Sequence, residues 1–192
     1  MQRMAIVLKH YLPKRYKIAL LDQQEGRMNV TFYADQALSP GTTVQYELKQ
    51  MHGRLVAHDL EIIDMPLALA RSAMLFLHHL IELCYHFVPE GSHDDRVYRL
   101  LSFALKMHEI SPTQQKNMLC LLFVLCDMYP EGVPYFVSLR EALERVSLQA
   151  IIQKEIDVKI EKYVRQWLYQ CIQMHGGASY FKTVHFLDEM QT

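Results

Sequence analysis

The amino-acid sequence predicts an α+β protein with two small domains: a five-stranded β-barrel over residues 1–64 and an all-α helical bundle over residues 65–192. The first observation behind this prediction is a change of pattern near residue 65, where short alternating segments give way to long apolar segments. The second is the composition, because 51% of the 192 residues are hydrophobic and 21% are charged. This apolar fraction is sufficient for a sizeable core.

The strands are expected in segments separated by turns: 4–8, 16–21, 28–32, 44–48 and 55–63. The first segment is continuously apolar, as in a strand that is buried on both faces, whereas the third and fourth alternate between apolar and polar residues. Gly26 suits the positive φ that the turn before the third strand requires. Such a set of strands fits a meander, an SH3-like barrel or an OB-fold barrel.

The helices are expected over 67–88, 96–108, 111–128, 135–146 and 151–174, with a last short helix in the tail 179–192. Asp64 can cap the first and central helix, with Pro66 inside its first turn. Ser92 or Asp94 can cap the second. The run Ser111-Pro112-Thr113-Gln114 predicts a capping box at the start of the third helix.

The charges exclude a global attraction to nucleic acid, because the formal net charge is −1. The first 64 residues hold eight Lys/Arg and seven Asp/Glu, and the remainder holds twelve and fourteen. Nucleic-acid binding would therefore require a local basic patch. The most membrane-like segment, 67–88, carries Arg71 and Glu82, so we expect a buried helix. The N-terminal apolar run is too short for a signal peptide.

The sequence predicts a cytoplasmic protein that is not an enzyme and holds no cofactor or metal. No G-x-S-x-G, phosphate-binding glycine loop or H-E-x-x-H occurs. The cysteines form no C-x-x-C pair, which indicates reduced, packed thiols: Cys84, Cys120, Cys126 and Cys171. Zinc spacing occurs at Cys171 and His175, but packed thiols and a surface histidine explain it more simply. His78, His79, Cys84 and His86 are a second set of possible ligands, but only His79 and His86 share a helical face, so no metal site is expected there.

One local cluster points to nucleic acid. The loop between the first two strands holds four cations and two tyrosines: Lys9, Tyr11, Lys14, Arg15, Tyr16 and Lys17. Proteins that bind single strands combine cations for the phosphates with aromatic faces for the bases. The alternative interpretation is an ordinary solvated loop whose tyrosines close the end of the barrel.

Several segments resemble RecO, the family of bacterial recombination mediators. Residues 4–9, MAIVLK, are similar to the family's first strand, and residues 25–27, EGR, are similar to the turn before its third strand. The most specific similarity is at residues 77–91, LHHLIELCYHFVPEG, which resemble the family's helix with its "LLPEG"-like turn. Residues 94–101, DDRVYRLL, would open the next helix. In architecture the resemblance covers roughly residues 4–150.

The resemblance implies an N-terminal OB-fold and a helical domain that bind single- and double-stranded DNA, anneal complementary strands and help to load the recombinase. It implies two protein partners, RecR and the acidic, Phe-ending tail of single-stranded DNA-binding protein. Arg27 and Arg54 would join the basic loop in the DNA surface. The second helix would offer cations to the partner's tail, with simple solvation as the alternative: Arg96, Arg99 and Lys106.

The chain departs from the family pattern in three ways, of which its short length is one. The C-x-x-C…C-x-x-C zinc module of many members is absent, which predicts a short form of RecO. Residues 34–39 are acidic to neutral where the family often has an Arg-rich loop, so fewer phosphate contacts are expected. Two rival hypotheses remain: a protein-interaction adaptor of the same fold with little or no DNA binding, and an enzyme whose site is assembled from dispersed residues.

Overall fold

The computed structural model describes residues 2–11, 16–33, 37–92, 94–130, 132–154, 158–174, 181 and 183. The chain forms two compact units, Met1–His108 and Glu109–Thr192, and each is described by itself. The predicted boundary between residues 64 and 65 coincides with the change from strand to helix. The first compact unit extends further, because it contains three helices in addition to the strands.

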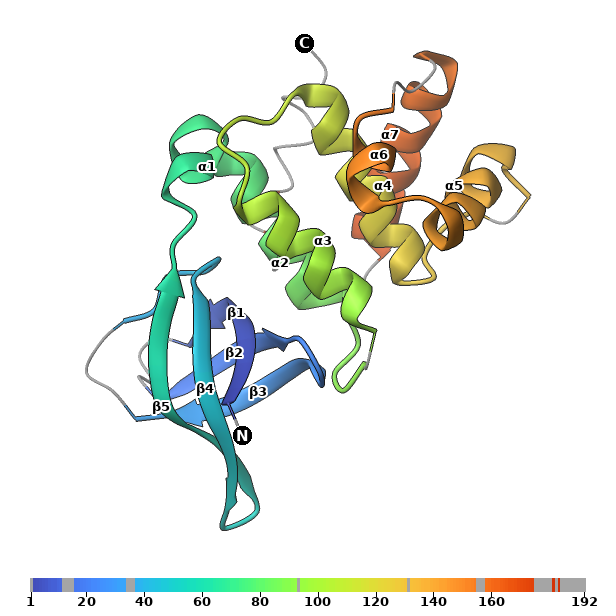
Figure 1. Cartoon of the computed structure of the whole chain (residues 1–192). Helices are drawn as coiled ribbons and strands as arrows, with labels where there is room; N and C mark the ends of the chain where they lie inside the picture. Colours follow the sequence, from blue (N-terminus) through green and yellow to red (C-terminus); the bar gives the residue numbers. More distant parts are fainter. Residues whose placement is uncertain are drawn as a thin grey trace. The chain divides into compact units, whose positions relative to one another are not determined.

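The strands of the first unit form a closed barrel in the order β1-β2-β3-β5-β4 (Figure 1). Their bounds are β1 Gln2–His10, β2 Lys17–Asp22, β3 Gly26–Phe32, β4 Thr43–Met51 and β5 Arg54–Asp64. All neighbours are antiparallel except β3 and β5, which pair in parallel. A meander would place β4 beside β3. The observed order is instead that of an OB-fold-like barrel, so the predicted five-stranded barrel is confirmed.

The barrel closes over a core of apolar side chains and one buried polar pair. The hydroxyl of Tyr46 donates to Asp22 at 2.7 Å, and both residues are buried. The other Asp22 carboxylate oxygen accepts from the backbone N–H groups of Gln24 and Glu25, each at 2.8 Å. Burial and the bond to Asp22 raise the pKa of Tyr46 above its usual value. This pair therefore joins β4 to the turn between β2 and β3.

The hairpin of β4 and β5 extends beyond the rest of the barrel (Figure 1). Met51 pairs with Arg54, so two residues form the turn, His52 with φ 49° and Gly53 with φ 73°. Two consecutive positive φ values define the type I′ turn that two-residue hairpins favour. Glycine adopts this conformation freely, but His52 is an uncommon residue there.

Three helices complete the first unit: α1 Leu67–Ser72, α2 Met74–Phe87 and α3 Asp95–Leu105. The prediction of one continuous helix over 67–88 is wrong, because the chain breaks at Ala73 with φ −149°. The hydroxyl of Ser72 donates to the carbonyl of His108 at 2.8 Å and also contacts carbonyls within α1. Serine side chains that bond locally to the backbone compete with helix propagation.

The predicted cap at Asp64 is also wrong. Asp64 is the last residue of β5, and its carboxylate accepts from the backbone N–H of Met65 at 2.8 Å. Pro66 occupies the position before α1 and contributes no side-chain cap. Asp94, by contrast, caps α3 by accepting from the N–H of Arg96 at 2.9 Å.

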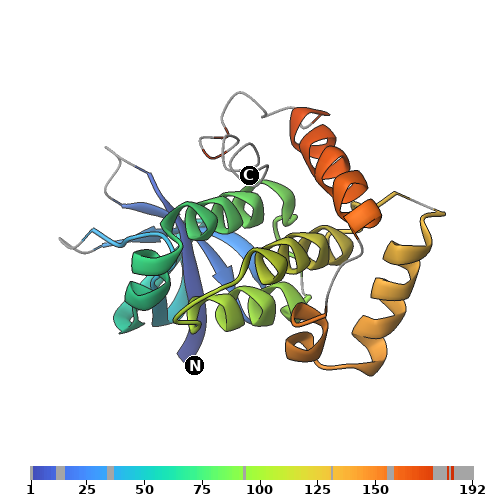
Figure 2. The same ribbon diagram turned by 90° about the horizontal axis from the view of Figure 1, so that it is seen from above.

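Helices α2 and α3 pack against each other and against β1, and α2 lies across the barrel strands (Figure 2). The turn that follows α2 binds the start of β3, because the N–H of Gly91 donates to the Arg27 carbonyl at 2.9 Å. Gly26 has φ 72°, and a Cβ there would lie 1.7 Å from the carbonyl oxygen of Ser92. The predicted glycine turn is thus confirmed, and it also permits a close approach of two backbones.

The second unit contains α4 Pro112–Leu125, α5 Pro134–Arg145, α6 Leu148–Ile152 and α7 Val158–Met174. The capping box is confirmed, with Gln114 N to Ser111 Oγ at 3.2 Å and Ser111 N to Gln114 Oε1 at 2.8 Å. The predicted helix over 151–174 is wrong, because α6 ends at Ile152 and α7 begins at Val158. The predicted tail helix, 179–192, falls almost entirely outside the described residues.

The cysteine side chains carry free thiols, two buried and two half-buried. Burial raises the pKa of Cys120 to about 12 and that of Cys171 to about 11, so both stay protonated near neutral pH. Within the described part of the chain, no group of three metal-ligating side chains comes together. His175, part of the possible zinc spacing, lies outside that part. None of the described helices is both long and apolar enough to span a membrane.

Candidate nucleic-acid interface

Four of the predicted DNA-binding residues meet on the barrel beside α2. Lys9 Nζ lies 4.4 Å from the ring centroid of Tyr85 and 5.4 Å from that of Tyr11. Lys17 Nζ lies 5.4 Å from the Tyr11 ring, and the Arg27 guanidinium lies 5.6 Å from the Tyr85 ring. We call these five residues the cation–tyrosine cluster. Each cation is held by the negative face of an aromatic ring.

Hydrogen bonds tie this cluster together. The hydroxyls of Tyr11 and Tyr85 are 2.8 Å apart, and the Tyr11 hydroxyl donates to the Asn29 side-chain oxygen at 3.0 Å. Since each hydroxyl has one proton, Tyr85 then donates to Tyr11. Burial and Tyr85 raise the pKa of Tyr11 above its usual value, which keeps that proton in place. The Tyr11 hydroxyl is therefore already engaged within the unit, while its ring faces the two lysines.

A second aromatic pair is open to solvent. Tyr16 and Tyr33 are 56% and 66% exposed, and their ring centroids are 5.7 Å apart with the planes tilted by 44°. Tyr16 directly precedes β2 and Tyr33 directly follows β3, and the Tyr16 carbonyl accepts from the N–H of Phe32 at 2.8 Å. Two exposed aromatic rings that contact each other form a contiguous patch, the kind of surface that marks a candidate binding site.

Tyr33 also lines a pocket beside the tip of the β4–β5 hairpin, which we call the hairpin pocket. Its volume is ≈ 330 Å³, and it is lined by Tyr33, Met51, His52, Arg54 and Val56. None of these side chains is acidic. The two lining residues Met51 and Arg54 flank the turn, so the geometry of the hairpin places them. The pocket thus combines an aromatic ring, a thioether and a guanidinium.

In the part of the chain that the structure describes, three cations of this surface have no acidic partner. Among the described residues, no carboxylate oxygen lies within 4.0 Å of Lys9, Lys17 or Arg54. Arg3, in contrast, pairs with Glu25 at 2.9 Å. Unpaired cations retain the full attraction for phosphate that counterion release converts into affinity.

Consecutive residues connect the two features. Tyr16 contacts Tyr33, which lines the hairpin pocket. Lys17, the residue after Tyr16, faces the Tyr11 ring of the cation–tyrosine cluster. The structure therefore brings most of the predicted residues to one part of the barrel. Lys14 and Arg15, which were also predicted, lie outside the described residues.

Sequence reasoning missed Tyr33, Met51, His52 and Tyr85. No local pattern marks Tyr33, because it is a single tyrosine at the end of a strand, and its partner Tyr16 is seventeen positions earlier in the chain. The pairing of Lys17 with Thr31 brings the two tyrosines together. The sequence did predict the turn at Met51-His52-Gly53, and the hairpin confirms it, but no local pattern indicated that these residues line a pocket.

The cations predicted for partner binding lie on α3 in the first unit. Arg96 forms charge-assisted hydrogen bonds with Asp94, the shortest at 2.6 Å, and Arg99 pairs with Asp95 at 3.1 Å. Lys106, the residue after α3, is exposed. These ion pairs were not predicted, and they leave Arg96 and Arg99 with less charge for a partner.

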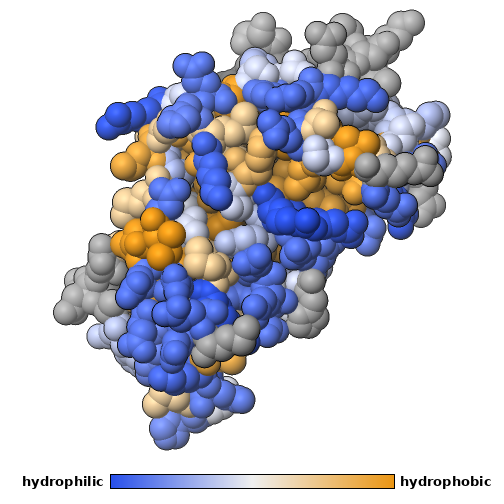
Figure 3. All heavy atoms as spheres, viewed as in Figure 1, coloured by the Kyte–Doolittle hydropathy of each residue, from blue (hydrophilic) through white to orange (hydrophobic). Residues whose placement is uncertain are grey.

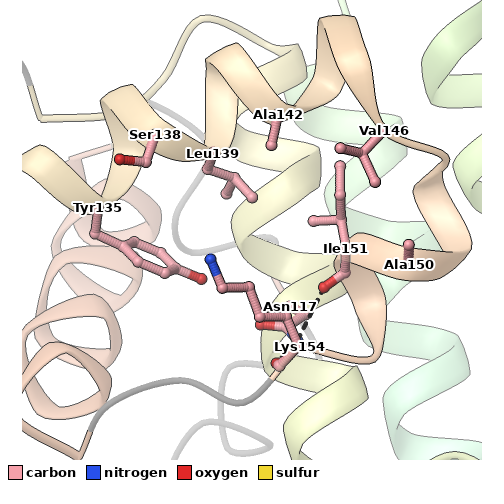
Figure 4. Close-up of a pocket in the computed structure, with 9 residues that line it drawn as sticks. All are labelled: Asn117, Tyr135, Ser138, Leu139, Ala142, Val146, Ala150, Ile151 and Lys154. Atoms are coloured by element: carbon pink, nitrogen blue, oxygen red, sulfur yellow. Dashed lines mark hydrogen bonds between the residues drawn. The ribbon is translucent and has the colours of Figure 1, made fainter.

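The second unit contains an apolar pocket with one cation (Figure 4). Its volume is ≈ 160 Å³, and its lining comes from α4, α5, α6 and the residues after α6: Asn117, Tyr135, Ser138, Leu139, Ala142, Val146, Ala150, Ile151 and Lys154. The Asn117 amide donates to the Lys154 carbonyl at 2.6 Å and thereby holds the backbone there. The Lys154 side chain extends toward the Tyr135 hydroxyl (Figure 4).

Another exposed apolar patch lies where β5 leads into α1 (Figure 3). Ile63, Met65 and Leu67 are exposed there. These side chains are aliphatic, so they provide neither the charges nor the aromatic faces that single strands require.

No protein-family model matches this chain, and no curated protein matches it. The support for a function therefore comes from the geometry of each unit and from the sequence segments that resemble RecO.

Proposed function

We propose that this protein is a non-enzymatic, RecO-like recombination mediator whose barrel binds single-stranded DNA. The observation that carries the proposal is the exposed Tyr16–Tyr33 pair, which adjoins Lys17 on a barrel with OB-fold-like strand order. In OB-fold barrels the face of strands 2 and 3, and the loops between strands 1 and 2 and between 4 and 5, bind oligonucleotides. Tyr16 and the hairpin tip belong to these loops.

Charge and stacking have separate roles in the proposed complex. Lys9, Lys17 and Arg54 contact phosphates, which supplies affinity without sequence preference and makes binding depend on salt. Tyr16 and Tyr33 stack on bases, which favours single strands because the bases of a duplex are not open to stacking. Annealing and recombinase loading would follow from holding a strand on the barrel while partner proteins are bound elsewhere.

The test is fluorescence anisotropy of a labelled single-stranded oligonucleotide, titrated with the protein at several salt concentrations. We expect log K to fall linearly with log salt, and the double variant Lys9→Ala/Lys17→Ala to bind more weakly. For this double variant, the slope of log K against log salt should be smaller in magnitude by about 1.4, since each phosphate contact on a single strand contributes about 0.7. Lys162→Ala, which removes an exposed cation from α7 in the second unit, is the matched control and should leave the slope unchanged.

The rival function is a protein-interaction adaptor of the same fold that does not bind DNA. The net charge of −1 favours it. Absence of binding to the oligonucleotide even at low salt would contradict the mediator and favour the adaptor. Binding that is equally strong in the double variant would contradict the assignment of this surface.

We further propose that the helical part, residues 65–192, acts as a bundle that binds partner proteins. The apolar pocket of Figure 4 is the place we assign to the acidic, Phe-ending tail of a single-stranded DNA-binding protein. Its apolar walls suit a terminal aromatic ring, and Lys154 suits the carboxylate. The ion pairs of Arg96 and Arg99 make them weaker candidates for this role. RecR remains a partner proposed from the resemblance, without assigned residues.

A further inference from the structure

We infer that the hairpin pocket accommodates one unstacked nucleobase of the bound strand, so that the protein recognises a base as well as the phosphate backbone. This inference rests on the proposed function, and it adds a distinct subsite to it. The base would stack on Tyr33, and Arg54 would contact the neighbouring phosphate or the base edge.

The lining of the pocket has the chemistry that a nucleobase requires. Tyr33 supplies a solvent-exposed ring, and Met51 supplies a polarizable sulfur that packs well against aromatic rings. The Met51 sulfur is 3.3 Å from Nε2 of His58, which holds the thioether in place. Val56 is 3% exposed and forms an apolar part of the wall. A planar, largely apolar group with polar edges fits these walls.

The charge of the pocket selects an anionic ligand. Arg54 is a permanent cation without a carboxylate within 4.0 Å among the described residues, and no lining residue is acidic. Guanidinium groups both pair with phosphates and stack on bases. The combination of base and phosphate in one nucleotide therefore matches the combination of Tyr33 and Arg54.

The size of the pocket limits the ligand to one group. A volume of ≈ 330 Å³ is at the lower end of the range for small-molecule sites, about 300–1,000 Å³. One base fits this space, whereas a base pair within a duplex cannot enter it without unstacking. The pocket should thus increase the preference for single strands over duplex.

The geometry of the hairpin places three of the lining residues. The two-residue turn holds Met51 and Arg54 opposite each other. The positive φ of His52, 49°, is the one that this turn type requires, and the same turn places His52 in the lining of the pocket.

The test compares an oligothymidylate with an abasic oligonucleotide of equal length, which retains every phosphate but lacks the bases. Anisotropy titrations are carried out with the full-length protein and its Tyr33→Ala and Tyr33→Phe variants at one salt concentration. We expect Tyr33→Ala to bind oligothymidylate about 5- to 150-fold more weakly, the loss of one stacked base. Binding of the abasic strand should not change, and Tyr33→Phe, which retains the ring, should bind oligothymidylate like the wild type.

The outcomes separate this inference from the proposed function. If the wild type binds both strands equally, or if Tyr33→Ala weakens both strands to the same extent, the base subsite and the stacking role of Tyr33 are contradicted, whereas DNA binding through the cations stands. If the wild type binds neither strand, both proposals are contradicted. Tyr33 is two-thirds exposed, so its replacement should leave the thermal unfolding transition unchanged.

Discussion

At the scale of single residues, His79 on α2 couples the stability of the first unit to pH. Its side chain is buried, and burial lowers its pKa to about 4, against a smaller opposite effect of Glu82. The ordinary pKa of about 6.5 applies when the chain is unfolded. The folded protein disfavours the charged form of His79, whereas the unfolded chain accepts the proton freely. The full free energy of unfolding is therefore present above about pH 6.5, and part of it is lost as the pH falls toward about 4.

We therefore expect the free energy of unfolding to decrease with acidification over this window, with a contribution from His79 of up to about 1.4 kcal/mol per pH unit. The measurement is urea denaturation followed by far-UV circular dichroism from about pH 7 to about pH 5. His79→Leu should reduce this slope. His78→Gln changes the exposed neighbour and should retain the wild-type slope. Equal slopes in wild type and His79→Leu would show that another group causes the acid sensitivity.

At the scale of elements, the contact between β3 and the turn after α2 depends on a glycine. Gly26 and Gly53 have nearly equal φ values, 72° and 73°, but their surroundings differ. A Cβ at Gly26 would collide with the Ser92 carbonyl oxygen, while nothing lies within 4 Å of a Cβ at Gly53. An alanine at Gly53 therefore measures only the cost of the positive φ, whereas an alanine at Gly26 adds the steric overlap with Ser92.

Gly53→Ala should lower the free energy of unfolding by about 1–2 kcal/mol, the cost of an L-residue in the left-handed region. Gly26→Ala should cost about 1–3 kcal/mol more, because the overlap forces the turn away from β3. Thermal and urea denaturation of both variants measure the difference. Equal losses would mean that the turn moves aside freely and that this contact contributes little.

At the scale of the whole molecule, the proposal assigns DNA to the first unit and a partner's tail to the second. Isothermal titration with an acidic peptide that ends in phenylalanine tests the second assignment. We expect Lys154→Glu to weaken binding by more than about tenfold, because it reverses the charge beside the pocket. Lys162→Glu makes the same change on the exposed face of α7 and should bind normally.

A peptide with an amidated C-terminus should bind more weakly than the free acid if Lys154 pairs with the terminal carboxylate. If both peptides bind the wild type and the Lys154→Glu variant alike, the tail occupies another surface. The same titration in the presence of the oligonucleotide shows whether the chain holds both ligands at once, as a mediator must.

Local features of the sequence determined the local structure. The alternation around Met28 and Val30 predicted a strand, the run from Ser111 to Gln114 predicted a capping box, and Gly26 predicted a turn with positive φ. All three are confirmed, because alternation of side chains, a cap and a glycine turn are each encoded by residues that are close in the chain. The break at Ala73 was not predictable in this way, since the Ser72 hydroxyl bonds to the distant carbonyl of His108.

The tertiary structure alone decided which chemistry-bearing residues meet. Strand order placed Tyr33 beside Tyr16 and next to the hairpin tip, and the packing of α2 on the barrel placed Tyr85 beneath Lys9. The sequence determined that a basic and aromatic loop exists between the first two strands. It could not determine the partners of that loop, because contacts between distant segments depend on strand register and helix packing, which no short pattern encodes.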